Sequence, residues 1–206
     1  MEVLGKLFGS DDRVKIMRLF LLNPETPFDA LAISERSKVS RGGVRRETTA
    51  LSKAGFIRPK SFLRETEKKR GNSTKIHKKR VSGWQLAPDF PLLAPVKNLL
   101  ISAEPLRPEV IIDRFRRAGK VKLILVAGVF IQNEDSRADI VLVGENLKKR
   151  ALENALRAIE AEVGKELSYA YFETADFLYR MNIYDKFVRD IMDYPHEKIY
   201  DKLGLP

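Results

Sequence analysis

Cysteine is absent from this chain of 206 residues, and histidine occurs only twice, at His77 and His196. Without cysteine the chain has no disulfide framework, no thiolate zinc site and no cysteine nucleophile, which suits a reducing compartment. The two histidines stand far apart in the sequence, so a histidine-based metal site is not expected. We therefore predict that the protein holds neither a metal nor a cofactor.

Long apolar runs are also missing. No stretch of about 18 apolar residues occurs, so no segment is expected to cross a membrane. The first residues, 1–13, contain an acid next to Met1 and lack the apolar core of a secretory signal. With 44% hydrophobic residues the chain can bury one large core or two small ones. We expect a soluble, cytoplasmic protein.

Positive charge is abundant but unevenly distributed. The chain has 38 Lys+Arg against 28 Asp+Glu, a formal net charge of +10. Residues 1–82 contain 20 basic and 9 acidic residues, whereas residues 83–206 contain 18 and 19. This asymmetry indicates a basic binding module joined to a near-neutral domain. A solvated, lysine-rich surface is the alternative, and the arrangement of the basic segment decides between the two.

The basic segment has the pattern of three helices. Ser10, followed by two aspartates, predicts the start of the first helix, because a hydroxyl cap and acids in the first turn both stabilise that end. A second, short helix is expected at about 28–38. Ser40 can cap a third helix at about 41–54, which Gly55 ends before a strand begins.

The third helix has one apolar face and one basic face. Val44, Thr48 and Leu51 recur at i, i+4 and i+7 and predict the buried face. Gly42 and Gly43 in the first turn would let that end of the helix approach another backbone, such as a phosphate chain, closely. The residues expected on or beside the exposed face are Arg41, Arg45, Arg46, Thr49 and Lys53.

A second basic feature follows the third helix. Eight of the 17 residues from 64 to 80 are Lys or Arg, and two are Glu. Residues 71–73, Gly-Asn-Ser, predict a turn. Val81, Trp84 and Leu86 then predict a strand that returns to the body of the domain. We expect a basic two-stranded hairpin here.

Three helices followed by a basic hairpin resemble a winged helix-turn-helix domain. The likeness rests on residues 51–57, Leu-Ser-Lys-Ala-Gly-Phe-Ile, which are similar to the family's third-helix exit, and on the wing at 62–85. It covers about residues 8–88. The resemblance implies that the third helix enters the major groove of DNA and that the wing, chiefly 62–82, follows the backbone. The DNA contacts that it implies are Ser40, Arg41, Arg45, Arg46, Thr49, Lys53, Lys68, Lys69, Arg70, Lys75, Lys78, Lys79 and Arg80.

The two sets of basic residues would have different roles on DNA. Lysines and arginines of the wing would neutralise phosphates and release counterions, which gives salt-sensitive affinity without sequence preference. The arginines of the third helix, together with Thr49, would read base edges, because arginine pairs bidentately with guanine.

Proline marks a boundary after the basic module. Five of the ten prolines lie between residues 87 and 108. Between them, residues 92–101 form a short apolar helix that could pack against a partner subunit or between two domains. We predict a first domain at 1–88, a linker at 89–108 and a second domain at 109–206.

The second domain alternates helices and strands, which predicts an α+β protein whose C-terminal α/β domain has a small mixed sheet. Helices are expected at 110–118, 146–163, 175–179, 183–192 and 196–203, with strands at 121–127, 139–144 and 167–172. The order strand, glycine turn, strand, helix and strand resembles that of the minimal nucleotidyltransferases, over about residues 109–181. In that family a Gly-Ser pair grips the triphosphate, and an Asp-x-Asp pair with a third acid holds two magnesium ions.

This sequence departs from that pattern at the catalytic positions. Gly128 is followed by valine, Arg137 replaces the first aspartate of the pair, and the third strand carries no acid. One carboxylate beside an arginine cannot hold two divalent cations. We expect Asp139 to be a structural acid or a cap. The spacing of Arg137 and Asp139 places both side chains on one face of a strand, where they could pair. Gly128, Arg137 and Asp139 could still form a vestigial site for an anion or a nucleotide.

These observations predict a DNA-binding transcriptional regulator and not an enzyme. Its second domain would have a nucleotidyltransferase-like fold and would serve dimerisation or effector sensing. The expected partners are double-stranded DNA, a second copy of the chain and a small nucleotide effector. Two alternatives stay open. One is a nucleotidyltransferase that modifies protein or nucleic acid through Asp139 and an unrecognised second acid; the other is an RNA-binding protein.

Overall fold

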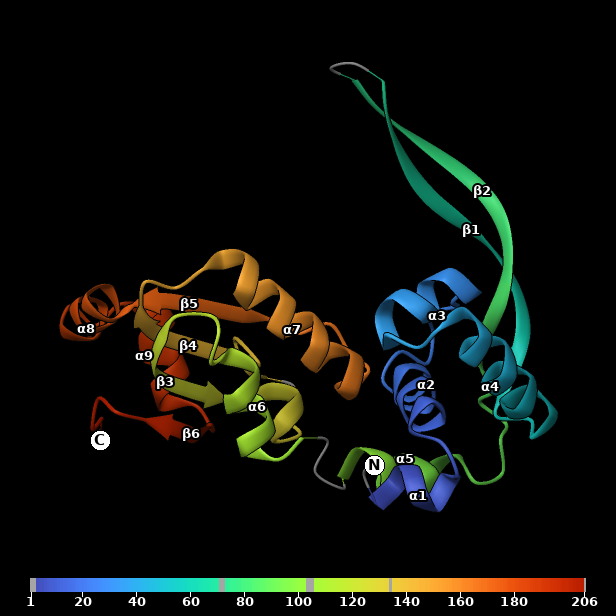
Figure 1. The fold of residues 1–206 in the computed structure, drawn as a ribbon, viewed down its shortest axis with the longest axis horizontal. Coiled ribbons are helices and arrows are strands. Elements are labelled where there is room, and N and C mark those ends of the chain that lie inside the picture. The colour runs from blue at the N-terminus through green and yellow to red at the C-terminus, as the bar shows by residue number, and fades with distance from the viewer. Residues whose placement is uncertain (1–2, 71–72, 103–105, 134, 206) are drawn as a thin grey trace. The chain divides into compact units, whose positions relative to one another are not determined.

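The computed structural model describes residues 3–70, 73–102, 106–133 and 135–205 and has an α+β fold (Figure 1). Within these ranges there are nine α-helices, a two-stranded hairpin and a four-stranded mixed sheet. No helix in the described part of the chain is long and apolar enough to span a membrane. The chain divides into two compact units, 1–103 with 163–165 and 104–162 with 166–206, and each is described by itself.

The first unit contains the three predicted helices, preceded by one more and followed by another. They are α1 (Val3–Phe8), α2 (Asp11–Leu21), α3 (Ala30–Ser37), α4 (Arg41–Lys53) and α5 (Leu93–Ser102). The predicted caps are confirmed: Ser10 Oγ accepts a hydrogen bond from Arg13 N at 3.2 Å, and Ser40 Oγ accepts one from Gly43 N at 3.1 Å. Helix α3 is shorter than expected because Asp29 is its N-cap.

The core of the first unit is built on α2. Ile16, Leu19 and Phe20 are fully buried, and Phe20 meets Phe28 edge to face with 5.7 Å between the ring centroids. Helix α5, which lies in the predicted linker, packs on the same core. Its Leu100 is fully buried in that core. The apolar helix therefore belongs to the first unit.

The hairpin consists of β1 (Ile57–Arg70) and β2 (Ser73–Leu86). The strands are antiparallel, and the register runs from Ile57 opposite Leu86 to Arg70 opposite Ser73. Of the turn predicted at 71–73, Ser73 begins β2, and residues 71–72 lie outside the described residues. The hairpin begins five residues before the predicted wing and projects beyond the helices that precede it (Figure 1).

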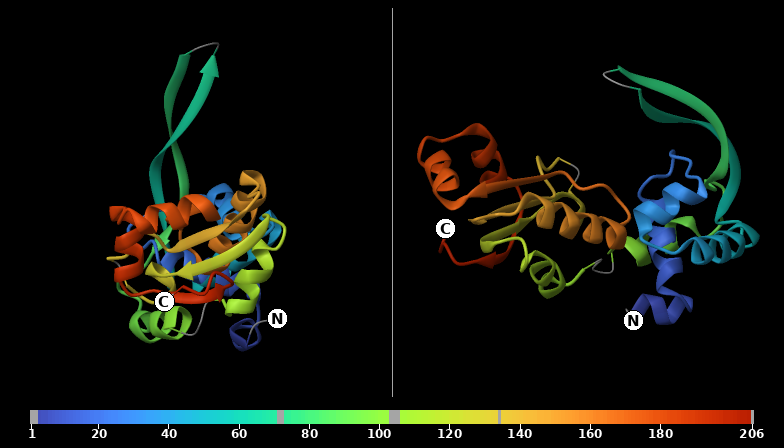
Figure 2. Two further views of the ribbon diagram at one scale, coloured as in Figure 1. Left: turned by 90° about the vertical axis from the view of Figure 1, so that its left-hand side faces the viewer. Right: turned by 45° about the horizontal axis from the view of Figure 1, so that its top comes forward.

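The second unit is built around the four-stranded sheet, whose strand order is β5-β4-β3-β6. Strands β4 and β5 are parallel, and the other neighbours are antiparallel. Figure 2 shows the helices of this unit packed around the sheet. The elements are α6 (Pro108–Phe115), β3 (Lys120–Val126), a short 3-10 turn η1 (Gly128–Phe130), β4 (Ile140–Glu145), α7 (Lys149–Val163), β5 (Tyr169–Glu173), α8 (Thr174–Asn182), α9 (Lys186–Asp193) and β6 (Glu197–Asp201).

Both faces of this sheet are covered, as the nearly continuous apolar strands β3 and β4 require. Leu123 and Leu125 share a buried cluster with Phe177 of α8 and Val188 of α9. Ile124 points to the opposite face by the alternation of the strand and is also fully buried. The sheet therefore forms the centre of the second unit.

The prediction of a helix at 196–203 is wrong. Residues 197–201 form β6, which pairs antiparallel with β3. Without it, β3 would be an edge strand with unpaired backbone groups. Eight residues have too little helix propensity to outweigh main-chain pairing at that edge, and Ile199 and Tyr200 suit a strand.

Candidate nucleic-acid interface

Helix α4 is fixed to the core through the face that the sequence predicts. Val44, Thr48 and Leu51 are buried. The Thr48 hydroxyl donates to the Val44 carbonyl at 2.7 Å, so burial leaves it satisfied. The rotation of α4 about its axis is thereby set, and the opposite face is left to solvent.

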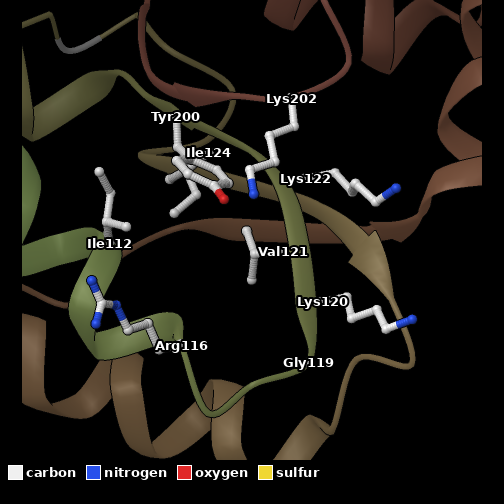
Figure 3. Close-up of a pocket in the computed structure, with 9 residues that line it drawn as sticks. All are labelled: Ile112, Arg116, Gly119, Lys120, Val121, Lys122, Ile124, Tyr200 and Lys202. Carbon is white, nitrogen blue, oxygen red and sulfur yellow. The ribbon is translucent and has the colours of Figure 1, made fainter.

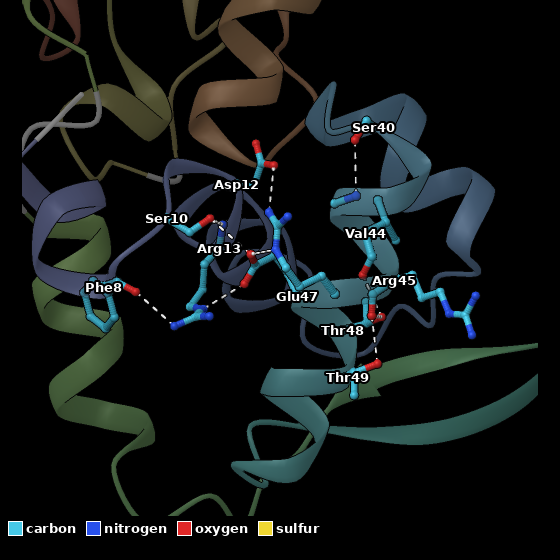
Figure 4. Close-up of polar contacts among 12 residues, drawn as sticks. Phe8, Ser10, Asp12, Arg13, Ser40, Val44, Arg45, Glu47, Thr48 and Thr49 are labelled. Atoms are coloured by element: carbon cyan, nitrogen blue, oxygen red, sulfur yellow. Dashed lines mark hydrogen bonds and ion pairs between the residues drawn. The ribbon is translucent and has the colours of Figure 1, made fainter.

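The exposed face of α4 carries a stripe of polar and basic side chains. Arg41, Arg45, Thr49 and Lys53 are exposed and follow one another every four residues. In Figure 4 the Arg45 guanidinium extends away from the helix. The Thr49 hydroxyl donates to the Arg45 carbonyl at 2.8 Å, which still leaves its oxygen able to accept. Ser40 is already engaged as the N-cap of this helix.

The two glycines at the start of α4 have different surroundings. A Cβ at Gly43 would lie 2.8 Å from Asp12 Oδ2 and 2.7 Å from Val39 Cγ1. A Cβ at Gly42 would meet nothing within 4 Å. The close approach at Gly43 is therefore made inside the domain, against α2 and the preceding loop. Only Gly42 is open to a ligand.

A buried acid joins α4 to the start of α2. We call Ser10, Asp12, Arg13, Arg46 and Glu47 the Glu47 cluster (Figure 4). The Glu47 side chain is 1% exposed. Its carboxylate accepts from Arg13 Nε at 2.8 Å, from Arg46 Nε at 2.9 Å and from the Ser10 hydroxyl at 3.2 Å. Three donors thus satisfy the buried carboxylate.

The Glu47 cluster keeps its acid ionised. Burial alone would raise the pKa of Glu47, but the hydrogen bonds from Arg46 and Arg13 outweigh it and hold the pKa below the ordinary value. Arg46, a predicted DNA contact, is therefore bound to Glu47, and it also lies 3.7 Å from Asp12. The sequence analysis missed Glu47. Its position three residues after Val44, on the buried side of the helix, was the available signal.

The base of the hairpin is anchored to the segment that precedes α3. Phe28 and Trp84 exchange two backbone hydrogen bonds, each 2.9 Å long. A Cβ at position 83 would collide with the Phe28 backbone, so the two chain segments can come this close only because residue 83 is glycine. Arg64 also pairs with Asp29 at 2.7 Å.

The Asp29 carboxylate serves α3 and the hairpin together. It accepts from Ala32 N at 2.8 Å as the helix cap, while its other oxygen holds Arg64. Burial would raise the pKa of Asp29, but the hydrogen bonds from Ala32 and Arg64 lower it below its ordinary value. The hairpin and α3 therefore share one ionised anchor.

The register divides the basic residues of the hairpin between its two faces. Lys79 is opposite Arg64, so these two share the face that carries the anchor to Asp29. Lys78 and Arg80 lie on the other face, and all three residues from 78 to 80 are exposed. The side chains of the remaining predicted wing contacts, Lys68, Lys69, Arg70 and Lys75, lie outside the described residues.

Comparisons with protein-family models, curated proteins and solved structures give no match for this chain.

In the second unit, Asp139 ties three backbone segments together. Its Oδ1 accepts from Val129 N in η1 and its Oδ2 from Ser168 N before β5, both at 2.8 Å. Gly128 has φ +55°, and a Cβ there would collide with the Asp139 carboxylate. The expectation that Asp139 is a structural acid agrees with these contacts. Gly128 and Asp139 lie together.

Arg137 does not join them, so the expected Arg137–Asp139 pair is wrong. Arg137 instead pairs with Asp190 of α9 at 3.0 Å. Strand β4 begins at Ile140, so neither residue lies on a strand face that would hold the two side chains side by side. Across the described ranges, no three His, Asp or Glu residues are grouped closely enough to hold a metal ion.

Proposed function

We propose that the first unit is a winged helix-turn-helix module that binds double-stranded DNA, and that the chain is a transcriptional regulator acting in the cytoplasm. Helix α4 would lie in the major groove, and the hairpin would follow the sugar-phosphate backbone. The second unit would have a nucleotidyltransferase-like fold without catalytic acids, and it would serve dimerisation or effector sensing.

The exposed stripe on α4 is the observation that carries this proposal. Its inner face is locked in the core, while Arg41, Arg45, Thr49 and Lys53 face solvent at regular spacing. A helix about 12 Å wide or less with such a face fits the major groove, where arginine and threonine can reach base edges. A rigid backbone beneath these side chains favours readout, since little backbone order must be gained on binding.

The hairpin supports the same proposal. It emerges from the end of α4, is tied to α3 through Asp29, and presents Lys78, Lys79 and Arg80 to solvent. Cations at these positions would neutralise phosphates beside the groove. The Glu47 cluster adds support because it holds α4 against α2 and fixes Arg46 at the edge of the exposed face of α4.

Selection of bound sequences from a random duplex pool, followed by fluorescence anisotropy, tests the proposal. We expect Arg45→Ala to weaken binding to the selected duplex by about 10-fold or more and to relax preference at one base pair, as removal of an arginine–guanine contact does. Lys186→Ala, in the second unit, serves as the control, because this exposed lysine is not part of the interface.

Two outcomes would contradict the proposal. One is an unchanged affinity and sequence preference when Arg41 and Arg45 are both replaced by alanine. The other is a higher affinity for duplex RNA than for duplex DNA at every salt concentration, which would indicate an RNA-binding protein. The deep, narrow major groove of duplex RNA does not admit a helix, so binding to duplex DNA and duplex RNA distinguishes a DNA-binding protein from an RNA-binding one.

A further inference from the structure

A pocket of about 410 Å³ opens in the second unit between α6 and the strands β3 and β6 (Figure 3). Its apolar wall consists of Ile112 from α6 with Val121 and Ile124 from β3. Tyr200 of β6 and Lys202, which follows β6, form the other side. Arg116 lies just after α6, as its C-cap. The pocket exists because the C-terminal segment pairs with β3.

The polar side of this pocket is cationic. Four of its lining residues are Lys or Arg, and none is an acid. Lys120 and Lys122 are held by Glu145, at 3.9 and 3.1 Å, and Figure 3 shows that their side chains point away from the pocket.

Lys202 differs from these two lysines. Its ammonium group has no carboxylate partner among the described residues and lies 5.6 Å from the centre of the Tyr200 ring. In Figure 3 the Lys202 nitrogen and the Tyr200 hydroxyl turn toward the same space. Arg116 pairs with the exposed Asp113 at 3.1 Å, and its own side chain is 75% exposed and therefore accessible.

We propose that this pocket binds a small aromatic phosphate of the size of a nucleoside monophosphate. Lys202 would hold the phosphate from the β6 side and Arg116 from the α6 side, and the Tyr200 hydroxyl could donate to a phosphate oxygen. The planar group would lie against Ile112 and Val121, which are partly exposed, with the buried Ile124 beneath them. A volume of about 410 Å³ falls within the range of small-molecule sites, and apolar walls with few polar groups are typical of them.

This site is separate from the residues that carry the DNA-binding proposal and from Gly128 and Asp139. Gly128 lies just after the C-terminal end of β3, and Asp139 lies just before β4. The pocket instead includes Gly119 and Lys120, at the N-terminal end of β3. Binding can therefore be measured without DNA, and its failure would leave the DNA-binding proposal untouched.

Isothermal titration calorimetry of the full chain, with AMP and UMP as probes, tests the inference. We expect at least one probe to bind with a Kd below about 1 mM, which is in the range of weak small-molecule binding. Adenosine and inorganic phosphate should each bind at least 10-fold more weakly than the nucleotide. Lys202→Glu should reduce nucleotide affinity at least 10-fold and Arg116→Ala several-fold.

Lys186→Glu is the matched control, since it reverses the same charge at an exposed lysine of α9, outside the pocket, and should leave binding unchanged. Circular dichroism would verify that each variant is folded. The inference is overturned if neither nucleotide binds with a Kd below about 1 mM, or if Lys202→Glu and Lys186→Glu have equal effects on nucleotide affinity. It is also overturned if Lys202→Glu leaves nucleotide affinity unchanged and weakens binding of duplex DNA, because the pocket would then be part of a nucleic-acid surface.

Discussion

At the scale of single residues, Glu47 shows how a buried charge can organise a helix. Its carboxylate is 1% exposed and is met by two guanidinium groups and a hydroxyl. Removing one partner of such a group is costly because the others are left unpaired. Periodicity places Glu47 on the buried side of α4, three residues after Val44, but it does not reveal the distant partners, Ser10 and Arg13, that satisfy its charge there.

We expect Glu47→Gln to lower the free energy of unfolding at pH 7 by roughly 1–3 kcal/mol, the range for hydrogen bonds to charged groups. The ordinary pKa is 4.5, and the folded value is lower. The stabilisation is therefore complete above about pH 4.5 and is lost as the pH falls through the folded pKa. Urea unfolding at several pH values checks both effects.

The exposed Glu35→Gln is the control for that prediction and should change stability by less than about 0.5 kcal/mol. A difference between wild type and Glu47→Gln that stayed constant down to the lowest pH would mean that ionisation of Glu47 contributes nothing.

Asp139 has a comparable structural role in the second unit. Both of its oxygens accept backbone N–H groups, whereas asparagine would turn an amide donor toward one of them. We expect Asp139→Asn to destabilise the second unit by about 1–3 kcal/mol in urea unfolding. Asp135→Asn, at an exposed position of the same loop, should have little effect. Equal stability of the two variants would refute the assignment.

At the scale of elements, the hairpin depends on one close backbone approach. Phe28 and Trp84 are bonded to each other in both directions, and Gly83 leaves room for the Phe28 carbonyl. The chain contains a single tryptophan, so Trp84 also reports on this anchor.

We expect Gly83→Ala to separate the two backbones and to cost about 1–3 kcal/mol, as overpacking does. Amide hydrogen exchange at Phe28 and Trp84 should accelerate, and Trp84 fluorescence should shift as the ring becomes more exposed. Ser82→Ala, at the neighbouring exposed position, should leave both signals as in the wild type. If Gly83→Ala exchanged at the wild-type rate, the hairpin would not depend on this contact.

Local sequence patterns are sufficient to predict some of the elements but not others. The helices α2 and α4 begin at Ser10 and Ser40 because capping chemistry is local, and both starts are predicted. Strand β6 was predicted as a helix because its conformation is imposed by the open edge of β3, some 70 residues earlier. A partner so distant leaves no periodic signal in the segment itself.

At the scale of the whole molecule, the uneven charge makes a prediction about salt. Each phosphate that is neutralised on duplex DNA adds about −0.9 to the slope of log affinity against log salt concentration. We expect Lys79→Ala with Arg80→Ala to reduce the magnitude of that slope by about 2, with nearly equal losses of affinity on all sequences. Anisotropy titrations across a salt series measure it.

Lys148→Ala with Lys149→Ala removes the same charge from the second unit and should leave the slope unchanged. Equal changes for the two double variants would mean that net charge alone, and not its position on the hairpin, drives binding.

The asymmetric charge, the α+β class, the three helices of the basic module and the buried face of α4 can all be predicted from the amino-acid sequence, because charge, capping and periodicity are properties of neighbouring residues. The sequence also predicts the structural role of Asp139. Four other features follow from contacts in the folded chain: Glu47 is buried among arginines, Arg137 pairs with Asp190, α5 joins the first core and the C-terminal segment is a strand. Each of these depends on a partner far away in the chain, and such partners meet only when the chain has folded.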